Sequence, residues 1–296
     1  MICIICGEEN DAKAREHIVS EAFGNKDYIM PLGAVCDACN NKFSAFEGKA
    51  VSQTVFVMER SRMGIPTKKG GAASGSVGGL KIKGNGELTK NLVEMQGLTS
   101  DMVQNFDPVK GTFQVIIPTF DGTAVPTSKL LLKMALESLY VSRRKIYEKY
   151  DFSDLRAFLL NPAGADWPFM TTNAEVTPFI SVPTFIDRYK LSGIRCTLRV
   201  SEVSDKVFLF KFKYGAVAMV INLLDNKGLL WMKAYQDADP KTMIYPEHFR
   251  VKLERRLASQ AVSTGSGRSE VFAAEEKAEA SDKGTVDVPG SDGSID

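Results

Sequence analysis

The sequence predicts an α+β protein in which a metal-bound N-terminal module precedes a mixed α/β domain with antiparallel strands and an acidic tail. Three observations lead to this prediction. Four of the five cysteines form two Cys-x-x-Cys pairs, two long segments carry apolar residues at helical spacing, and short apolar strands separated by turn residues fill much of 176–235. The 296 residues, 44% hydrophobic and 25% charged, are ordinary for a folded protein of about two domains.

The two cysteine pairs predict a structural zinc site. Their spacing is C-x2-C-x29-C-x2-C, and two such turns supply the four thiolates of a tetrahedral site. The alternative is a redox dithiol, but that motif usually occurs once, at the start of a helix. The expected ligands are Cys3, Cys6, Cys36 and Cys39. The fifth cysteine, Cys196, is expected to be a small apolar residue in a strand.

Within the N-terminal module we expect two strands and a helix. The strands lie around His17–Val19 and over roughly Tyr28–Val35. The helix begins at Asn40 and ends at Gly64. Its apolar stripe consists of Phe43, Phe46, Ala50, Val51, Val55 and Met58.

The rest of the chain shows one strong helix and several strands. The helix follows Pro126 and presents a wide apolar face between 130 and 146, and a shorter helix covers Ser153–Leu160. Arg143, Arg144 and Lys145 suit the negative end of the first helix, and they could also contact phosphate. The expected strands are Leu80–Lys83, Thr112–Ile117, Phe179–Val182, Ile194–Val200, Val207–Phe212 and Ala216–Leu223.

Composition divides the chain into four parts. Residues 1–62 are the cysteine module, 63–90 are a glycine-rich linker or loose hairpin, 91–258 are an α+β domain of unassigned role, and 259–296 are a disordered acidic tail. The tail has eight acids and three bases, a net charge of −5, so the total of +1 leaves +6 for the remainder. Such a charge fits a polyanion partner without demanding one.

The sequence contains no signal for a membrane or for secretion. No run of about 18 apolar residues occurs, so no membrane span is expected. The N-terminus lacks the basic start, apolar stretch and cleavage site of a secretory signal. We therefore expect a cytoplasmic protein, because thiols in a reducing compartment more often bind metal than form disulfides.

Between the cysteine pairs lies an acid followed by a histidine, Glu16 and His17. The carboxylate can bind a hard divalent cation, and the imidazole can take a proton from water. Neighbours on a strand point to opposite sides, so they converge on one cleft only at a strand end or bulge. The other histidine, His248, has no such framework and is interpreted as structural or surface.

Asn40 follows the last cysteine of the cluster directly. Its side-chain oxygen can bind the same divalent cation, or it can cap the helix that is expected to start there. Glu47 lies two turns further along this helix, where it is either a neighbour of the site or a solvated residue.

These residues resemble the zinc-knuckle HNH endonucleases, which have a ββα-metal fold. The resemblance rests on three elements in order within 1–60, namely Cys3-Ile-Ile-Cys6, Glu16-His17-Ile18-Val19 with Gly24, and Val35-Cys-Asp-Ala-Cys-Asn40. It implies that Glu16 and Asn40 bind a catalytic Mg²⁺ or Mn²⁺ and that His17 is the general base. Ser20 stands where the family often has proline. What orients His17 is open, because Asn25 lies in the loop and Pro31 occupies the place that spacing from Asn40 selects.

The resemblance implies a metal-dependent endonuclease that hydrolyses DNA, similar to bacterial restriction or antiphage defence effectors. The alternative is a catalytically inactive zinc module that binds nucleic acid or protein, and a thiol oxidoreductase is a weaker one. A homodimer would explain cleavage of both strands by modules with one active site each. The domain at 91–258 could recognise DNA, bind a trigger ligand or bind a partner protein.

Overall fold

Helices packed on antiparallel sheets make up the observed fold, so the α+β prediction is confirmed. This computed structural model describes residues 1–77, 79–115, 120, 124–161, 166–185 and 196–263. The tail predicted over 259–296 lies outside the described residues from 264 onward, and 259–263 belong to a helix, α7 (His248–Ser263). Contacts group the chain into Met1–Leu253 and Glu254–Asp296. Among the described helices, none has the length and apolar character needed to span a bilayer.

The chain before the first helix has little regular structure. It contains isolated bridges between Ile2 and Glu9 and between His17 and Ile29, and the 3-10 turn η1 (Glu21–Phe23). The second predicted strand, Tyr28–Val35, is therefore too long. The carbonyl of Pro31 accepts a hydrogen bond from the Ala34 N–H at 3.1 Å, which turns the chain toward the second cysteine pair.

The first helix, α1 (Asp37–Val51), begins three residues before the predicted start at Asn40. Its N-cap is Cys36, whose sulfur accepts the backbone N–H of Cys39 at 3.4 Å. A thiolate here takes the place of the usual Ser, Asp or Asn cap. Asn40 consequently lies inside the first turn, and the interpretation of Asn40 as the helix cap is wrong.

The predicted apolar stripe runs through two helices instead of one. α1 ends at Val51 with Ser52 as its C-cap, and α2 (Thr54–Met63) follows after Gln53. The corner lets a strand approach closely, since a Cβ atom on Gly75 would lie 2.1 Å from the Ser52 carbonyl oxygen. α2 ends at Gly64, in the left-handed conformation at φ 69°, as the sequence predicts.

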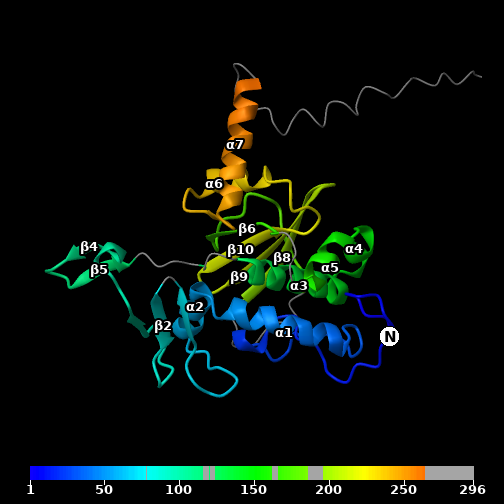
Figure 1. Ribbon diagram of the computed structural model, residues 1–296, viewed down its shortest axis with the longest axis horizontal. Coiled ribbons are helices and arrows are strands. Elements are labelled where there is room, and N and C mark those ends of the chain that lie inside the picture. The colour runs from blue at the N-terminus through cyan, green and yellow to red at the C-terminus, as the bar shows by residue number, and fades with distance from the viewer. Residues whose placement is uncertain (78, 116–119, 121–123, 162–165, 186–195, 264–296) are drawn as a thin grey trace, which may run out of the picture. The chain divides into compact units, whose positions relative to one another are not determined.

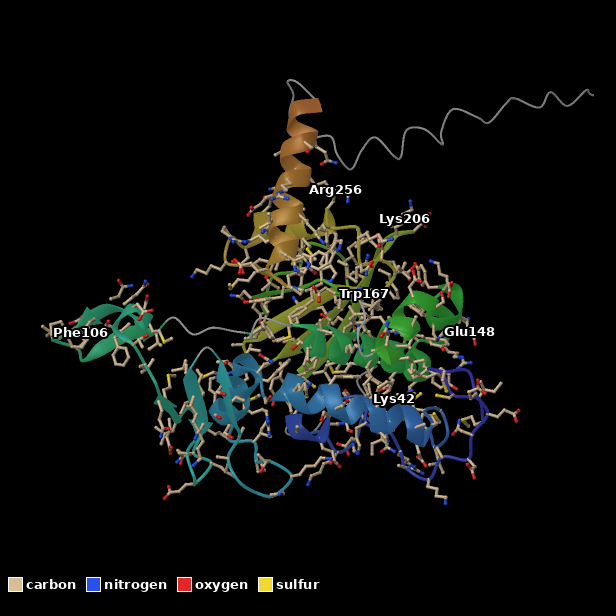
Figure 2. All side chains as sticks on the ribbon, viewed as in Figure 1. Lys42, Phe106, Glu148, Trp167, Lys206 and Arg256 are labelled. Atoms are coloured by element: carbon tan, nitrogen blue, oxygen red, sulfur yellow. The ribbon has the colours of Figure 1, made fainter. Side chains whose placement is uncertain are left out.

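The glycine-rich segment forms a small antiparallel sheet that packs on α2. Its strands are β1 (Ser74–Val77), β2 (Leu80–Gly84) and β3 (Val93–Gln96). A separate hairpin of β4 (Val103–Asp107) and β5 (Thr112–Val115) follows, with Phe106 65% exposed (Figure 2). The predicted strand Thr112–Ile117 coincides with β5 as far as Val115, and its last two residues lie outside the described part.

The main sheet has six strands in the order β11-β6-β10-β9-β8-β7, and every neighbouring pair is antiparallel. Three strands of this sheet, β8, β9 and β10, match predicted strands. Two others, β6 and β11, were not predicted. Of the strand expected over Phe179–Val182, only the last residue forms part of a strand, β7. The bounds are β6 (Phe169–Asn173), β7 (Val182–Pro183), β8 (Cys196–Ser204), β9 (Val207–Tyr214), β10 (Val217–Asn222) and β11 (Met243–Tyr245).

The long helix α3 (Val125–Ser142) lies between α1 and the main sheet, where it contacts β9 and β10 (Figure 1). It is buried nearly all round, as a central core helix is. Ser128 donates a hydrogen bond to the Trp167 carbonyl at 2.6 Å, and the Trp167 indole donates to the Asn222 carbonyl at 2.7 Å. The remaining helices are α4 (Arg144–Lys149), α5 (Ser153–Leu160) and α6 (Trp231–Ala238).

One hydrophobic core joins the cysteine-rich part to the rest of Met1–Leu253. Phe23 is fully buried, and its ring centroid lies 5.7 Å from that of Phe212 and 4.8 Å from that of Tyr214. Tyr28 stacks on Phe185 with a centroid distance of 4.4 Å. The N-terminal module therefore depends on the sheet and on α3 for its packing.

Candidate functional site

Four cysteine sulfurs gather in one cluster, as predicted. The ligand atoms of Cys3, Cys6, Cys36 and Cys39 all lie within 4.8 Å of one another. The Cys6 and Cys36 sulfurs are 3.8 Å apart, which equals the edge, about 3.8 Å, of a tetrahedron with zinc–sulfur bonds of about 2.3 Å. None of the cysteines is in a disulfide. The cluster therefore has the composition and spacing of a structural zinc site.

The segment with the acid and the histidine pairs with the chain that leads to the second cysteine turn. Ile18 N–H donates to the Tyr28 carbonyl at 2.9 Å, and Met30 N–H donates to the Glu16 carbonyl at 2.8 Å. This short antiparallel pairing places Glu16 and His17 on opposite sides of the strand. Glu16 is 4% exposed, whereas the side chain of His17 is 26% exposed.

Asn25 closes the loop between these two paired segments. It is 1% exposed, and its amide nitrogen donates to the carbonyls of Val19 and Tyr28. Its side-chain oxygen accepts the backbone N–H groups of Asp27 and Tyr28 at 3.1 and 3.0 Å. The sequence prediction left this residue unassigned. Its four hydrogen bonds fix the loop that follows His17, so Asn25 holds the backbone of the site and does not contact the imidazole.

Glu16 belongs to a buried ion cluster around Lys133 of α3. The Lys133 ammonium lies 2.5 Å from Glu16 Oε1, 2.8 Å from Glu47 Oε1 and 3.3 Å from Glu137 Oε2. It also donates a hydrogen bond to the backbone carbonyl of His17 at 2.6 Å. Lys133 and Glu137 are both fully buried. The interpretation of Glu47 as a solvated helix residue is therefore wrong, since Glu47 shares Lys133 with Glu16.

The cluster holds three carboxyl groups and one ammonium group, and burial shifts their pKa values. Burial alone would lower the pKa of Lys133, but the carboxylates of Glu137, Glu47 and Glu16 raise it above its usual value. Burial raises the pKa of Glu137 well above its usual value, and it raises the pKa of Glu16 as well, although Lys133 opposes both shifts. Lys133 therefore stays charged, while the carboxyl groups compete for its single charge.

The variant Glu137→Gln is expected to remove a pH-dependent loss of stability. A raised folded-state pKa means that the carboxyl group stabilises the fold fully below its unfolded value, 4.5, and that this contribution is lost as pH rises through the folded pKa. The melting temperature of the wild type should therefore fall more steeply than that of the variant as pH rises above 4.5, by about 2–4 °C for each kcal/mol of stability lost. Parallel pH profiles would contradict this. Glu148→Gln, at an exposed ion pair with Arg144, is the control.

Among the described residues, the side chains of the two other predicted site residues, His17 and Asn40, form none of the ion pairs of this cluster. The Nε2 atom of His17 is 3.2 Å from Glu21 Oε1, and its Nδ1 atom is buried without a hydrogen-bond partner among the described residues. Asn40 is half-buried in the first turn of α1, directly after a ligand of the cysteine cluster. Within the described part of the chain, neither Glu16 nor His17 belongs to a group of three or more cysteine, histidine or acidic side chains whose ligand atoms lie close enough to bind one metal ion.

Sequence reasoning missed Lys133, Glu137 and Glu21. Lys133 and Glu137 are charged residues four positions apart on the apolar helix, and this spacing on a buried face could have indicated an internal ion pair. Glu21 stands four residues after His17, a spacing that carries no signal outside a helix. The turn Glu21–Phe23 brings it back to the imidazole.

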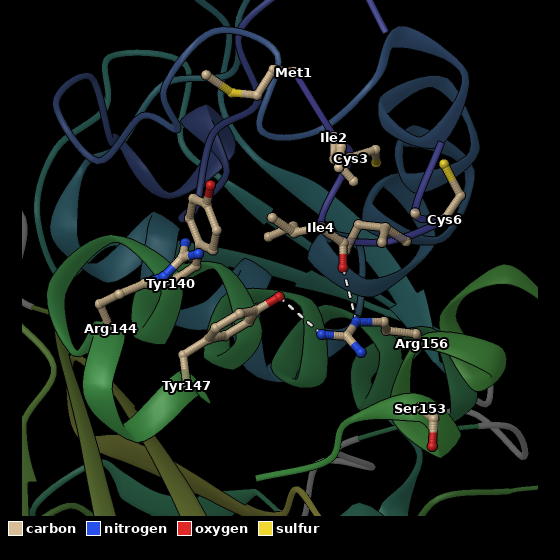
Figure 3. A pocket seen from close by; sticks show the side chains of 12 residues that line it. Met1, Ile2, Cys3, Ile4, Cys6, Tyr140, Arg144, Tyr147, Ser153 and Arg156 are labelled. Carbon is tan, nitrogen blue, oxygen red and sulfur yellow. Dashed lines mark hydrogen bonds between the residues drawn. The ribbon is translucent and has the colours of Figure 1, made fainter. Parts of the chain in front are cut away.

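A cavity of about 720 Å³ lies beside the first cysteine turn (Figure 3). Glu16, His17 and Asn40 do not line it. Its arginines are already engaged: Arg156 donates to the Ile4 carbonyl and to the Tyr147 hydroxyl, both at 2.9 Å, and Arg144 pairs with Glu148 at 2.6 Å. The contacts of Arg156 tie α4 and α5 to the cysteine turn.

Comparison with known proteins bears on the N-terminal part alone. The family model described as HNH endonuclease matches residues 3–55, a range that contains the four cysteines, Glu16, His17 and Asn40. Neither the curated proteins nor the solved structures give a match. The family match implies a nucleic acid as substrate. Residues 3–55 of this chain are thus similar to the HNH endonuclease family.

Proposed function

We propose that the protein is a metal-dependent HNH endonuclease that hydrolyses DNA phosphodiester bonds. The observation that carries the proposal is the family match over residues 3–55, a range that includes the partly exposed His17 and the four-cysteine cluster. A structural zinc in that cluster would fix Cys39 and, through it, the adjoining Asn40.

In this proposal His17 is the general base. Its imidazole takes a proton from water, the water oxygen forms a bond to phosphorus, and the bond from phosphorus to the leaving oxygen breaks. The leaving oxygen takes a proton from solvent. The Nδ1 atom has no hydrogen-bond partner among the described residues, so its lone pair is not engaged elsewhere in the described part of the chain.

Glu16 and Asn40 are the proposed ligands of a catalytic Mg²⁺ or Mn²⁺. Carboxylate and amide oxygens are donors that such hard cations prefer, so the donor set fits. When bound, the cation would stabilise negative charge at the phosphate and the leaving oxygen. Lys133 already lies 2.5 Å from Glu16, so a cation has to share or displace this ammonium. We therefore expect weak binding of the cation.

The test is a plasmid-nicking assay with Mg²⁺ or Mn²⁺. His17→Ala should lower the cleavage rate by about 10²–10⁴-fold, the usual contribution of a general base. His248→Ala is the matched control, because His248 is the chain's other histidine, and it should cleave like the wild type. Equal cleavage by His17→Ala and the wild type would refute the mechanism.

The ion pair between Glu16 and Lys133 favours one alternative, a zinc module that binds nucleic acid without cleaving it. A catalytically inactive zinc module needs neither a free carboxylate to bind a cation nor a general base, and Glu16 is already paired with Lys133. This alternative predicts that the purified wild type binds DNA in a salt-dependent way but does not nick it with any divalent cation.

We further propose a bacterial restriction or antiphage defence role in the cytoplasm, where reduced thiols are available for metal. A homodimer would place two sites on one duplex. The part of the chain after residue 90 would then recognise DNA, a trigger ligand or a partner protein. Analytical ultracentrifugation with and without DNA tests the dimer.

A further inference from the structure

The two ring nitrogens of His17 have different surroundings. Nε2 lies 3.2 Å from the Glu21 carboxylate, whereas Nδ1 has no hydrogen-bond partner among the residues that the structure describes. A neutral imidazole carries a proton on one nitrogen and a lone pair on the other. Because an ionised carboxylate can only accept hydrogen bonds, this arrangement favours the proton on Nε2 and the lone pair on Nδ1.

Glu21 is held in place by its turn. The hydroxyl oxygen of Ser20 accepts the Ala22 N–H at 3.4 Å, and Gly24 ends the turn in the left-handed conformation at φ 83°. Phe23, the last residue of the turn, is fully buried, with its ring centroid 5.0 Å from that of Phe56. The backbone that carries Glu21 is therefore anchored in the core, although its side chain is 41% exposed.

Lys68 holds the second carboxylate oxygen of Glu21. Its ammonium is 2.7 Å from Glu21 Oε2, while Glu21 Oε1 faces the imidazole. The hydrogen bond from Lys68 lowers the pKa of Glu21, and the positive charges of Lys68 and Lys26 act in the same direction. Glu21 is therefore ionised at neutral pH and remains an acceptor.

We propose that Glu21 is a positioning residue that fixes the ring orientation and the tautomer of His17, with Lys68 as its support. This inference rests on the proposed function, in which Nδ1 accepts the proton of water. The Asn25 side chain makes its four hydrogen bonds to backbone groups, so it does not orient the imidazole ring. Glu21 fills that role from four residues downstream.

Nitrogen NMR on ¹⁵N-histidine-labelled protein tests the tautomer without any need for activity. The chain has two histidines, so a His248→Asn variant assigns both signals. With zinc bound and no magnesium added, at about pH 8, His17 should carry its proton on Nε2. In Glu21→Ala the share of this tautomer should fall, whereas Lys68→Met, which keeps the carboxylate, should change it less. The same tautomer populations in wild type and Glu21→Ala would overturn the proposal.

Kinetics supply the second readout. In a Ser-His-Asp catalytic triad, loss of the buried aspartate that fixes the histidine tautomer lowers kcat by about 10⁴-fold. The pair of His17 and Glu21 is more exposed, so we expect Glu21→Ala to lower kcat on the order of 10- to 100-fold, with little change in KM. Glu148→Ala, at another exposed i,i+4 pair, should leave both constants unchanged. An unchanged kcat in Glu21→Ala counts against the proposal. If the wild type cleaves nothing, the proposed function fails, and the NMR comparison alone decides the role of Glu21.

Discussion

Removal of the metal from the four-cysteine cluster should unfold the N-terminal part of the protein. Before α1 the described chain has only two isolated bridges and one short turn, so few backbone hydrogen bonds hold it. Structural zinc contributes about 10–16 kcal/mol in small zinc-finger peptides, which is comparable to the stability of a whole domain, about 5–15 kcal/mol. Titration with a chelator, followed by circular dichroism and limited proteolysis, should show one zinc released per chain together with loss of structure.

The loss of structure on removal of zinc should extend beyond the cysteine module. Phe23 and Tyr28 pack on residues of the main sheet, so unfolding of the module removes one side of the shared core. Cys39→Ser should therefore bind no zinc and lower the melting temperature of the whole unit. Cys196→Ser is the matched control, since Cys196 lies outside the cluster. A metal-free protein that melts at the temperature of the zinc-loaded one would disprove this account.

Features specified by local sequence were predictable. The thiolate cluster follows from spacing alone, and α5 (Ser153–Leu160) has the predicted bounds because Asn161 and Pro162 stop the helix. β9 was found because its apolar run is bounded by turn residues on both sides. These signals lie within a few residues of the element that they define.

Features specified by distant contacts were not predictable. The ammonium of Lys133 reaches the carbonyl of His17, 116 residues earlier in the chain. The corner between α1 and α2 is where Gly75 approaches Ser52, a contact that no periodicity reveals. β11 is a short strand at the edge of the main sheet, and β6 is the short strand next to it. The pairing of both strands depends on residues far along the chain. Local patterns therefore located the candidate residues, and tertiary packing decided what each one touches.

Lys133→Met should destabilise the protein by about 3–5 kcal/mol, because the loss of one partner leaves buried carboxylates without a compensating charge. The substitution removes the ammonium that Glu16, Glu47 and Glu137 share and one hydrogen bond to the His17 carbonyl. Thermal or urea unfolding measures the change. The matched control is Lys129→Met, one turn earlier on α3. Lys129 is also buried and donates to the Asn161 carbonyl at 2.5 Å, and its ammonium lies over the rings of Phe46 and Phe158. Because Lys129 has no ion pair among the described residues, its loss should be smaller, about 1–2 kcal/mol.

A second variant separates charge from packing. Lys133→Met combined with Glu16→Met, Glu47→Met and Glu137→Met removes all four charges, and replacement of a whole buried ion cluster by apolar residues of similar volume is often close to neutral for stability. This variant should recover most of what Lys133→Met loses. The single variant also tests the competition at Glu16: with the ammonium gone, millimolar Mn²⁺ should raise its melting temperature more than that of the wild type. If Mn²⁺ stabilises both proteins equally, Lys133 and the divalent cation do not compete for Glu16, and the proposed ligand role of this carboxylate loses its support.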